Sequence, residues 1–178
     1  MKRNDAKWLV VMIFAIGLVF TSCKKDEDDD NDTQVNEFVA TDATFENFSS
    51  WNLGAELRGA DPSLGMAHGG NDSTAIRSIY FFDNAKPVNG KYPVGTVIVK
   101  YSHNPAGSLN EYTAMVKRGN GFDASNGDWE YFMLSGDGEI ATDTDGMQMR
   151  GDGPTMMGGM CLSCHIKADN QDFIFTSR

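Results

Sequence analysis

Three residues near the C-terminus have types and spacing that can attach and coordinate a haem. Cys161, Cys164 and His165 lie in the segment CLSCH, which has the Cys-x-x-Cys-His spacing of c-type haem attachment. Each thiol can form a thioether with one haem vinyl group, and the adjacent histidine can coordinate the iron as a neutral imidazole. The spacing therefore predicts one covalent haem c, with His165 as the axial iron ligand.

Other uses of the same cysteine pair are open at this point. Export to an oxidising compartment would allow a plain disulfide between Cys161 and Cys164. A zinc site would need a fourth ligand, and the sequence has no second cysteine pair. A thioredoxin-like redox pair is expected at a helix start after a βαβ pattern, which this chain lacks. The motif favours haem over these alternatives.

Lys100 is a second candidate for chemistry, because its neighbours in the sequence are apolar. It follows Val97, Ile98 and Val99 in the segment GTVIVK, so both faces of this strand are expected to be apolar. Burial of an isolated ammonium is costly and lowers its pKa, which would leave a nucleophilic amine. The alternative is that Lys100 ends the strand and extends to solvent.

Several further side chains could be a sixth iron ligand, which would close the iron and make the protein an electron carrier. Two histidines and five methionines near the haem cysteines are the candidates: His68, His103, Met147, Met149, Met156, Met157 and Met160. Most of these methionines are more simply explained as adaptable packing beside the porphyrin. Six aromatic residues are interpreted as core: Tyr80, Phe82, Tyr101, Trp129, Phe132 and Phe175.

The elements that must position these residues are mainly strands. Strand-like segments occur at 75–82, 95–102, 111–118 and 128–134, separated by Gly and Asn turns. Such short connections favour antiparallel pairing over helical crossovers. A short helix over 44–51, with a cap at Thr41 or Asp42, is expected to cover the sheet. The fold class is therefore α+β, mainly an antiparallel sheet with a few short helices.

Two segments outside these strands are expected to be irregular or short. Residues 135–160 are rich in Gly and Asp and predict a long loop that leads to CLSCH. The alternation in DFIFT near the C-terminus predicts a closing strand or a packed tail.

The order of these blocks resembles the cytochrome P-460 family, which also includes the c′-beta cytochromes. The blocks are GTVIVK, MVK, DWEYF, a Gly-rich loop, CLSCH and DFIFT, and the likeness covers most of residues 45–176. It implies a β-rich haem fold, a homodimer and an open iron face. Family members either oxidise hydroxylamine or bind nitric oxide and related small ligands. The resemblance thus implies redox chemistry on hydroxylamine or a related small nitrogen compound, with an unidentified redox partner protein. Alternatives are a nitric oxide binding protein and a six-coordinate electron-transfer cytochrome.

The resemblance also implies roles for individual residues. In the hydroxylamine-oxidising members a lysine at the end of the GTVIVK-like block is bonded to the porphyrin edge, which corresponds to Lys100 here. Arg77 matches an arginine of the family. Its guanidinium is expected either near a haem propionate or the distal pocket, or on the protein surface. These members carry an acidic distal residue where this chain has Thr113, and Glu111 lies two residues earlier on the same strand face. This departure weakens the case for oxidase activity.

The N-terminus predicts export and a lipid anchor. A basic start, an apolar stretch too short to span a bilayer, and Thr-Ser-Cys at 21–23 indicate a signal peptide over 1–22 with lipidation at Cys23. The alternative is ordinary cleavage near Ser22 with a free thiol at Cys23. Residues 23–36 form an acidic tether expected to be disordered, and 37–178 form the haem domain. The tether is a solvated spacer or a surface-export signal.

The net charge sets the expected partners of the mature protein. The full chain carries a net charge of −10, and loss of three basic and one acidic residue with the signal peptide makes it −12. This acidity disfavours nucleic acid and anionic lipid surfaces as partners. Membrane attachment would therefore come through the acyl chains alone. The protein would face the periplasm or the cell surface.

Overall fold

The computed structural model describes residues 36–175. The predicted signal peptide, the lipidation site at Cys23 and nearly all of the acidic tether lie outside the described residues. Within residues 36–175, no helix has the length and apolar character needed to cross a bilayer.

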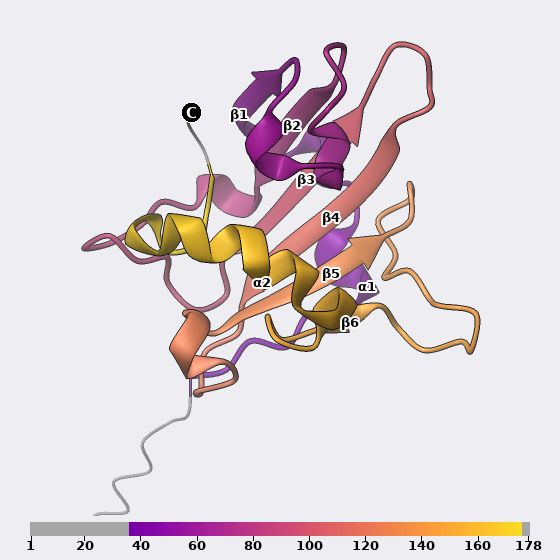
Figure 1. Ribbon diagram of the computed structural model, residues 1–178. Helices are drawn as coiled ribbons and strands as arrows, with labels where there is room; N and C mark the ends of the chain where they lie inside the picture. Colours follow the sequence, from indigo (N-terminus) through magenta and orange to yellow (C-terminus); the bar gives the residue numbers. More distant parts are fainter. Residues whose placement is uncertain (1–35, 176–178) are drawn as a thin grey trace, which may run out of the picture. The chain divides into compact units, whose positions relative to one another are not determined.

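The described part is built on one antiparallel sheet of six strands in sequence order (Figure 1). The strands are β1 (Asn52–Arg58), β2 (Ile76–Phe81), β3 (Val97–His103), β4 (Asn110–Lys117), β5 (Trp129–Leu134) and β6 (Arg150–Gly151). Each strand pairs with the next one along the chain. Two short α-helices, α1 (Asp42–Phe45) and α2 (Met160–His165), complete the fold together with several 3-10 turns. The predicted α+β class is confirmed.

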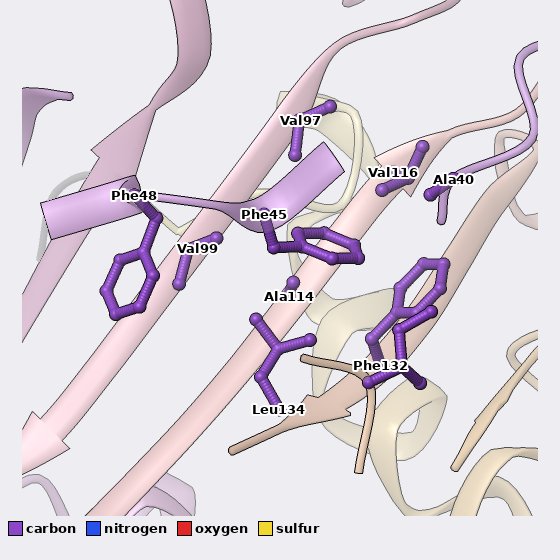
Figure 2. Close-up of a cluster of buried hydrophobic side chains, with 10 residues drawn as sticks. Ala40, Phe45, Phe48, Val97, Val99, Ala114, Val116, Phe132 and Leu134 are labelled. Atoms are coloured by element: carbon purple, nitrogen blue, oxygen red, sulfur yellow. The ribbon is translucent and has the colours of Figure 1, made fainter. Parts of the chain in front are cut away.

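Both faces of the central strands are covered, which explains their apolar runs. On one face, Phe45 from α1 packs over Val97, Val99 and Ala114 of β3 and β4 (Figure 2). On the opposite face, Ile79, Ile98, Met115 and Tyr131 lie beneath the C-terminal segment that contains α2. Alternate residues of each strand therefore belong to different cores. The face beneath α2 is the one that carries the candidate site.

Four strands agree with the sequence expectation to within a residue or two, and other elements differ. The helix expected over 44–51 is capped at Thr41 by a capping box but ends at Phe45, because Asn47 adopts left-handed backbone and a 3-10 turn follows at Phe48–Ser50. The strand β1 was not anticipated. It is a mostly exposed edge strand with a bulge between Leu53 and Ala55, so its hydrophobic signal is weak.

The C-terminal segment also corrects one expectation. Residues 172–175 of this segment do not form a strand, because Asp172 and Phe173 both have positive φ angles, of 52° and 68°. A 3-10 segment at Ile166–Gln171 comes first, and Phe173 and Ile174 are then buried against the sheet. The alternative of a packed tail is therefore the correct one.

Candidate functional site

A cavity of about 640 Å³ lies between α2, the sheet and the loop that joins β1 to β2. Its walls are mainly apolar, with Ile79, Ile98 and Met115 on the sheet side. The side chains that can do chemistry and that line it are His68, Lys100, Glu111, Thr113, Tyr131, Cys161, Cys164 and His165. The cavity thus brings together nearly all of the site residues expected from the sequence.

Helix α2 presents the haem-attachment motif to this cavity. Cys161, Cys164 and His165 are three and four positions apart, so one helical face carries all three. Gly158 and Gly159 have positive φ angles of 64° and 83°, which lets the chain turn sharply into the helix. Both thiols are free and half-buried. They are therefore available for thioether bonds.

The imidazole of His165 is held in a defined orientation. Its Nδ1 atom lies 2.7 Å from the carbonyl oxygen of Phe173, and the rings of Tyr131 and Phe175 contact it edge-on at 5.4 Å and 5.7 Å between centroids. Burial, and then the charge of Lys100, lower the pKa of His165 to about 3. The ring is therefore neutral, donates from Nδ1 to the carbonyl, and keeps the Nε2 lone pair for a metal.

A buried ion pair fixes the turn that carries this carbonyl. The carboxylate of Asp172 accepts hydrogen bonds from Lys117 Nζ at 2.8 Å and from the backbone N–H of Tyr92 at 2.7 Å. The indole Nε1 of Trp129 donates to the carbonyl oxygen of Asp172 at 2.8 Å. Two consecutive left-handed residues cost about 1–3 kcal/mol each and persist only when their surroundings hold them. We call Tyr92, Lys117, Trp129 and Asp172 the turn lock.

Lys100 lies on the cavity face of β3 and is paired in register with Thr113 on β4 and Ile79 on β2. Burial lowers the pKa of Lys100 to about 8, against the opposing attraction of Glu111. Lys100 lines the same cavity as Cys161 and Cys164. The amine is therefore mainly charged near neutral pH, but its neutral, nucleophilic fraction is larger than that of an exposed lysine.

Glu111 meets His68 at the cavity wall. Glu111 Oε1 lies 2.7 Å from His68 Nδ1, although the loop of His68 and the strand of Glu111 are far apart in sequence. Burial alone raises the pKa of Glu111, but the contact with His68 and the charge of Lys100 outweigh it and lower this pKa overall. Burial, followed by the charge of Lys100, lowers the pKa of His68. Glu111 is therefore a carboxylate beside a predominantly neutral imidazole.

Arg77 supports the cavity from behind. It is 2% exposed, which excludes the surface position considered for it. Its guanidinium donates to the carbonyl oxygens of Gly59 at 2.9 Å and His68 at 2.9 Å, and it does not line the cavity. Arg77 thus anchors the loop that carries His68.

The candidate sixth ligands fall into different places. His68, Met157 and Met160 line the cavity, whereas Met147 is 67% exposed. His103 stacks on Tyr101 at 4.4 Å and does not line the cavity. Met149 and Met156 pack in the core beneath α2, as the packing interpretation expected.

Three of the aromatic residues expected in the core differ from that expectation. Phe82 is 50% exposed, Tyr101 is half-buried in a stack with His103 and Tyr112, and Phe175 lines the cavity beside His165. Trp129 and Phe132 are fully buried as expected.

The residues present fit a c-type haem. The cavity volume is within the range of cofactor sites, about 300–1,000 Å³. The hydroxyl of Tyr131 is buried, lines the cavity and has no hydrogen-bond partner among the described residues. A polar group bound in the cavity would satisfy this hydroxyl. Together with two free thiols and an oriented neutral imidazole, the donor set matches haem attachment and axial ligation.

Sequence comparison supports the same conclusion. The family model described as Cytochrome P460 matches residues 62–176, which is more than half of the chain and includes every residue assigned to the cavity except Leu57 and Asp61. The comparisons with curated proteins and with solved structures gave no match. The apolar cavity and the CLSCH helix that faces it fit a haem cytochrome. The chain therefore belongs to the cytochrome P460 family.

Proposed function

We propose that this protein is a mono-haem c-type cytochrome that carries out redox chemistry on hydroxylamine or a related small nitrogen compound. The observation that carries the proposal is the position of Lys100. Its amine lines the same apolar cavity as Cys161, Cys164 and His165, with a pKa lowered to about 8. The hydroxylamine-oxidising branch of the family uses a lysine at this position.

Each side chain of the site has a separate proposed role in holding the haem. Cys161 and Cys164 attach the porphyrin, and His165 binds the iron through Nε2 while Phe173 holds its Nδ1. When bound, the haem supplies an iron that accepts electrons from the substrate and passes them to a redox partner. The apolar walls exclude bulk water, so charges that develop inside interact strongly with Lys100 and Glu111.

The Lys100 amine is proposed to form a bond to the porphyrin edge. The N–C bond replaces one N–H bond of the amine and one C–H bond of the porphyrin. The step is a two-electron oxidation, for which a peroxide is a suitable class of oxidant because it takes up both hydrogens as water. Deprotonation of Lys100 precedes it, and the lowered pKa makes the neutral amine accessible.

Peptide mass analysis of the holoprotein tests this bond. Digestion should yield one haem-bearing species that joins the Lys100 segment to the CLSCH segment, lighter by two hydrogens than its parts. Lys100→Met should restore an ordinary c-type spectrum and lower hydroxylamine turnover by at least about 100-fold, as loss of a transition-state interaction does. Lys86→Met is the matched control, because Lys86 is exposed and outside the cavity.

A second function is supported by Thr113. It occupies the cavity position where the oxidising members carry an acid, and a hydroxyl is a poor proton acceptor. The alternative is reversible binding of nitric oxide without turnover. An unlinked Lys100 and no hydroxylamine oxidation by the wild type would contradict the oxidase proposal and favour the binding protein. Turnover in the absence of the link would contradict the role given to Lys100.

A further inference from the structure

His68 and Glu111 are proton-exchanging groups in the cavity that lie in contact and that neither haem attachment nor the Lys100 bond uses. The imidazole Nδ1 and a carboxylate oxygen lie 2.7 Å apart, and the two side chains are 19% and 26% exposed. The contact is a close approach of the two groups, because Nδ1 makes no aligned hydrogen bond within the described residues. Both line the cavity. A carboxylate against one nitrogen of a neutral imidazole orients the ring and leaves the other nitrogen as a proton acceptor.

The backbone at His68 is built to hold this ring in place. His68 has left-handed backbone, with φ 53° and ψ 29°, which is uncommon for a residue other than glycine. The carbonyl oxygens of His68 and Gly69 accept hydrogen bonds from Arg77 at 2.9 Å and 3.4 Å. Arg77 is buried in the neighbouring strand. Backbone strain that is maintained by a buried side chain is typical of functional positions.

The groups that face His68 favour its neutral form. Lys100 on β3 and Arg77 on β2 are positive and lower the pKa of His68 after burial, whereas Glu111 on β4 opposes them. His165 on α2 is neutral, because its own pKa is lowered to about 3. Asp61, which also lines the cavity, belongs to the same loop as His68.

We propose that His68, oriented by Glu111, is the proton acceptor for small protic ligands that enter this cavity. Nδ1 faces Glu111, so the acceptor is Nε2. The N–H or O–H bond of the ligand, or the C–H bond of HCN, breaks heterolytically, its electron pair stays on the ligand atom, and the proton forms an imidazolium that Glu111 stabilises. Arg77 is a positioning residue in this scheme. The inference deepens the proposed function, since hydroxylamine carries such protons, and the pair supplies the acceptor that Thr113 cannot.

Cyanide binding to the ferric holoprotein tests the inference without hydroxylamine. At neutral pH cyanide is present as HCN, which must lose its proton as the anion binds the iron. Stopped-flow association should be at least about 100-fold slower in His68→Asn, the lower range of general-base effects. Asparagine is chosen because it tolerates left-handed backbone. His103→Asn is the matched control, because His103 lies outside the cavity, and its rate should equal that of the wild type.

The pH profile provides an independent readout. Only neutral His68 accepts a proton, so the wild-type rate should fall as pH drops through the pKa of His68, which lies below its ordinary value of 6.5. Loss of the Glu111 carboxylate lowers that pKa further, so Glu111→Gln should move the acidic limb to lower pH and slow the reaction above the limb, where His68 is neutral in both proteins. An unchanged limb in Glu111→Gln would overturn the pairing.

The outcomes separate this inference from the proposed function. Equal cyanide rates in the wild type and His68→Asn would overturn it, even if hydroxylamine were oxidised. Faster binding in His68→Asn would show His68 to be an iron ligand and would overturn it as well. Slow binding in the variant supports it whether or not hydroxylamine is turned over. If His68→Asn does not yield holoprotein, the wild-type rate in deuterium oxide decides: a slower rate supports proton transfer, and an equal rate refutes it.

Discussion

At the scale of single residues, one cavity gives different chemical roles to groups that the sequence leaves far apart. Burial lowers the pKa of Lys100 and of His165, which makes a neutral amine accessible in one and keeps the imidazole of the other neutral. Glu111 keeps its charge in the same cavity because His68 and Lys100 lie beside it. Environment rather than residue type therefore assigns the roles.

The two cysteines of α2 should make separate, additive attachments. Cys161→Ala and Cys164→Ala should each retain haem through one thioether, because both thiols line the cavity independently. The double variant should release all haem on acid-acetone extraction. Haem content after denaturing electrophoresis is the measurement, with His165→Ala as a control that keeps both thioethers but changes the axial spectrum. Complete extraction from wild-type protein matured in a competent host would contradict c-type attachment.

At the scale of elements, helix α2 and the turn at Asp172–Phe173 act together. The helix fixes the position of the His165 backbone. The turn supplies the carbonyl oxygen that sets the orientation of the imidazole ring. The turn lock holds two residues in strained backbone by three kinds of hydrogen bond. The orientation of the His165 ring thus depends on Lys117 and Trp129, which lie on different strands.

Asp172→Asn should destabilise the fold and perturb the iron ligand. Asparagine tolerates left-handed backbone, but loss of the carboxylate leaves Lys117 buried and unpaired, which costs about 3–5 kcal/mol. Urea unfolding measures that loss, and resonance Raman of the iron–histidine bond should show a shifted stretching frequency.

A second substitution separates charge from packing in the turn lock. Lys117→Met combined with Asp172→Asn should recover part of the lost stability, because the buried charge is removed. Glu56→Gln is the control, since its ion pair with Arg58 is exposed and is worth less than about 1 kcal/mol. An unshifted iron–histidine frequency in Asp172→Asn would show that the turn does not position His165.

At the scale of the whole molecule, we propose that the acidic haem domain is exported and held at a membrane by lipid on Cys23. Wild-type protein should incorporate labelled fatty acid and sediment with membranes, whereas Cys23→Ser should do neither, because the acidic domain has little electrostatic attraction to anionic lipid. Autoradiography after fractionation is the measurement. Equal labelling of both forms would exclude lipidation at Cys23.

Local patterns in the sequence were enough for much of the fold and for the attachment motif. The apolar alternation and Gly or Asn turns located β2, β3, β4 and β5, because buried central strands combine strong hydrophobic signals with clear breaks. The spacing in CLSCH depends only on neighbouring residues, whereas its placement on a helix at Met160–His165 came from the structure. The exposed edge strand β1 and the two-residue β6 lacked such a signal.

Only the tertiary structure decided which distant groups meet. The contact of His68 with Glu111 results from a loop folded over the sheet, and Arg77 turned out to support that loop rather than line the cavity. No local pattern in DFIFT announces that Asp172 and Phe173 turn left-handed to place a carbonyl on His165. Periodicity reports which face of a strand is buried, but proton transfer and ligand orientation depend on angstrom-scale contacts between segments far apart in the chain.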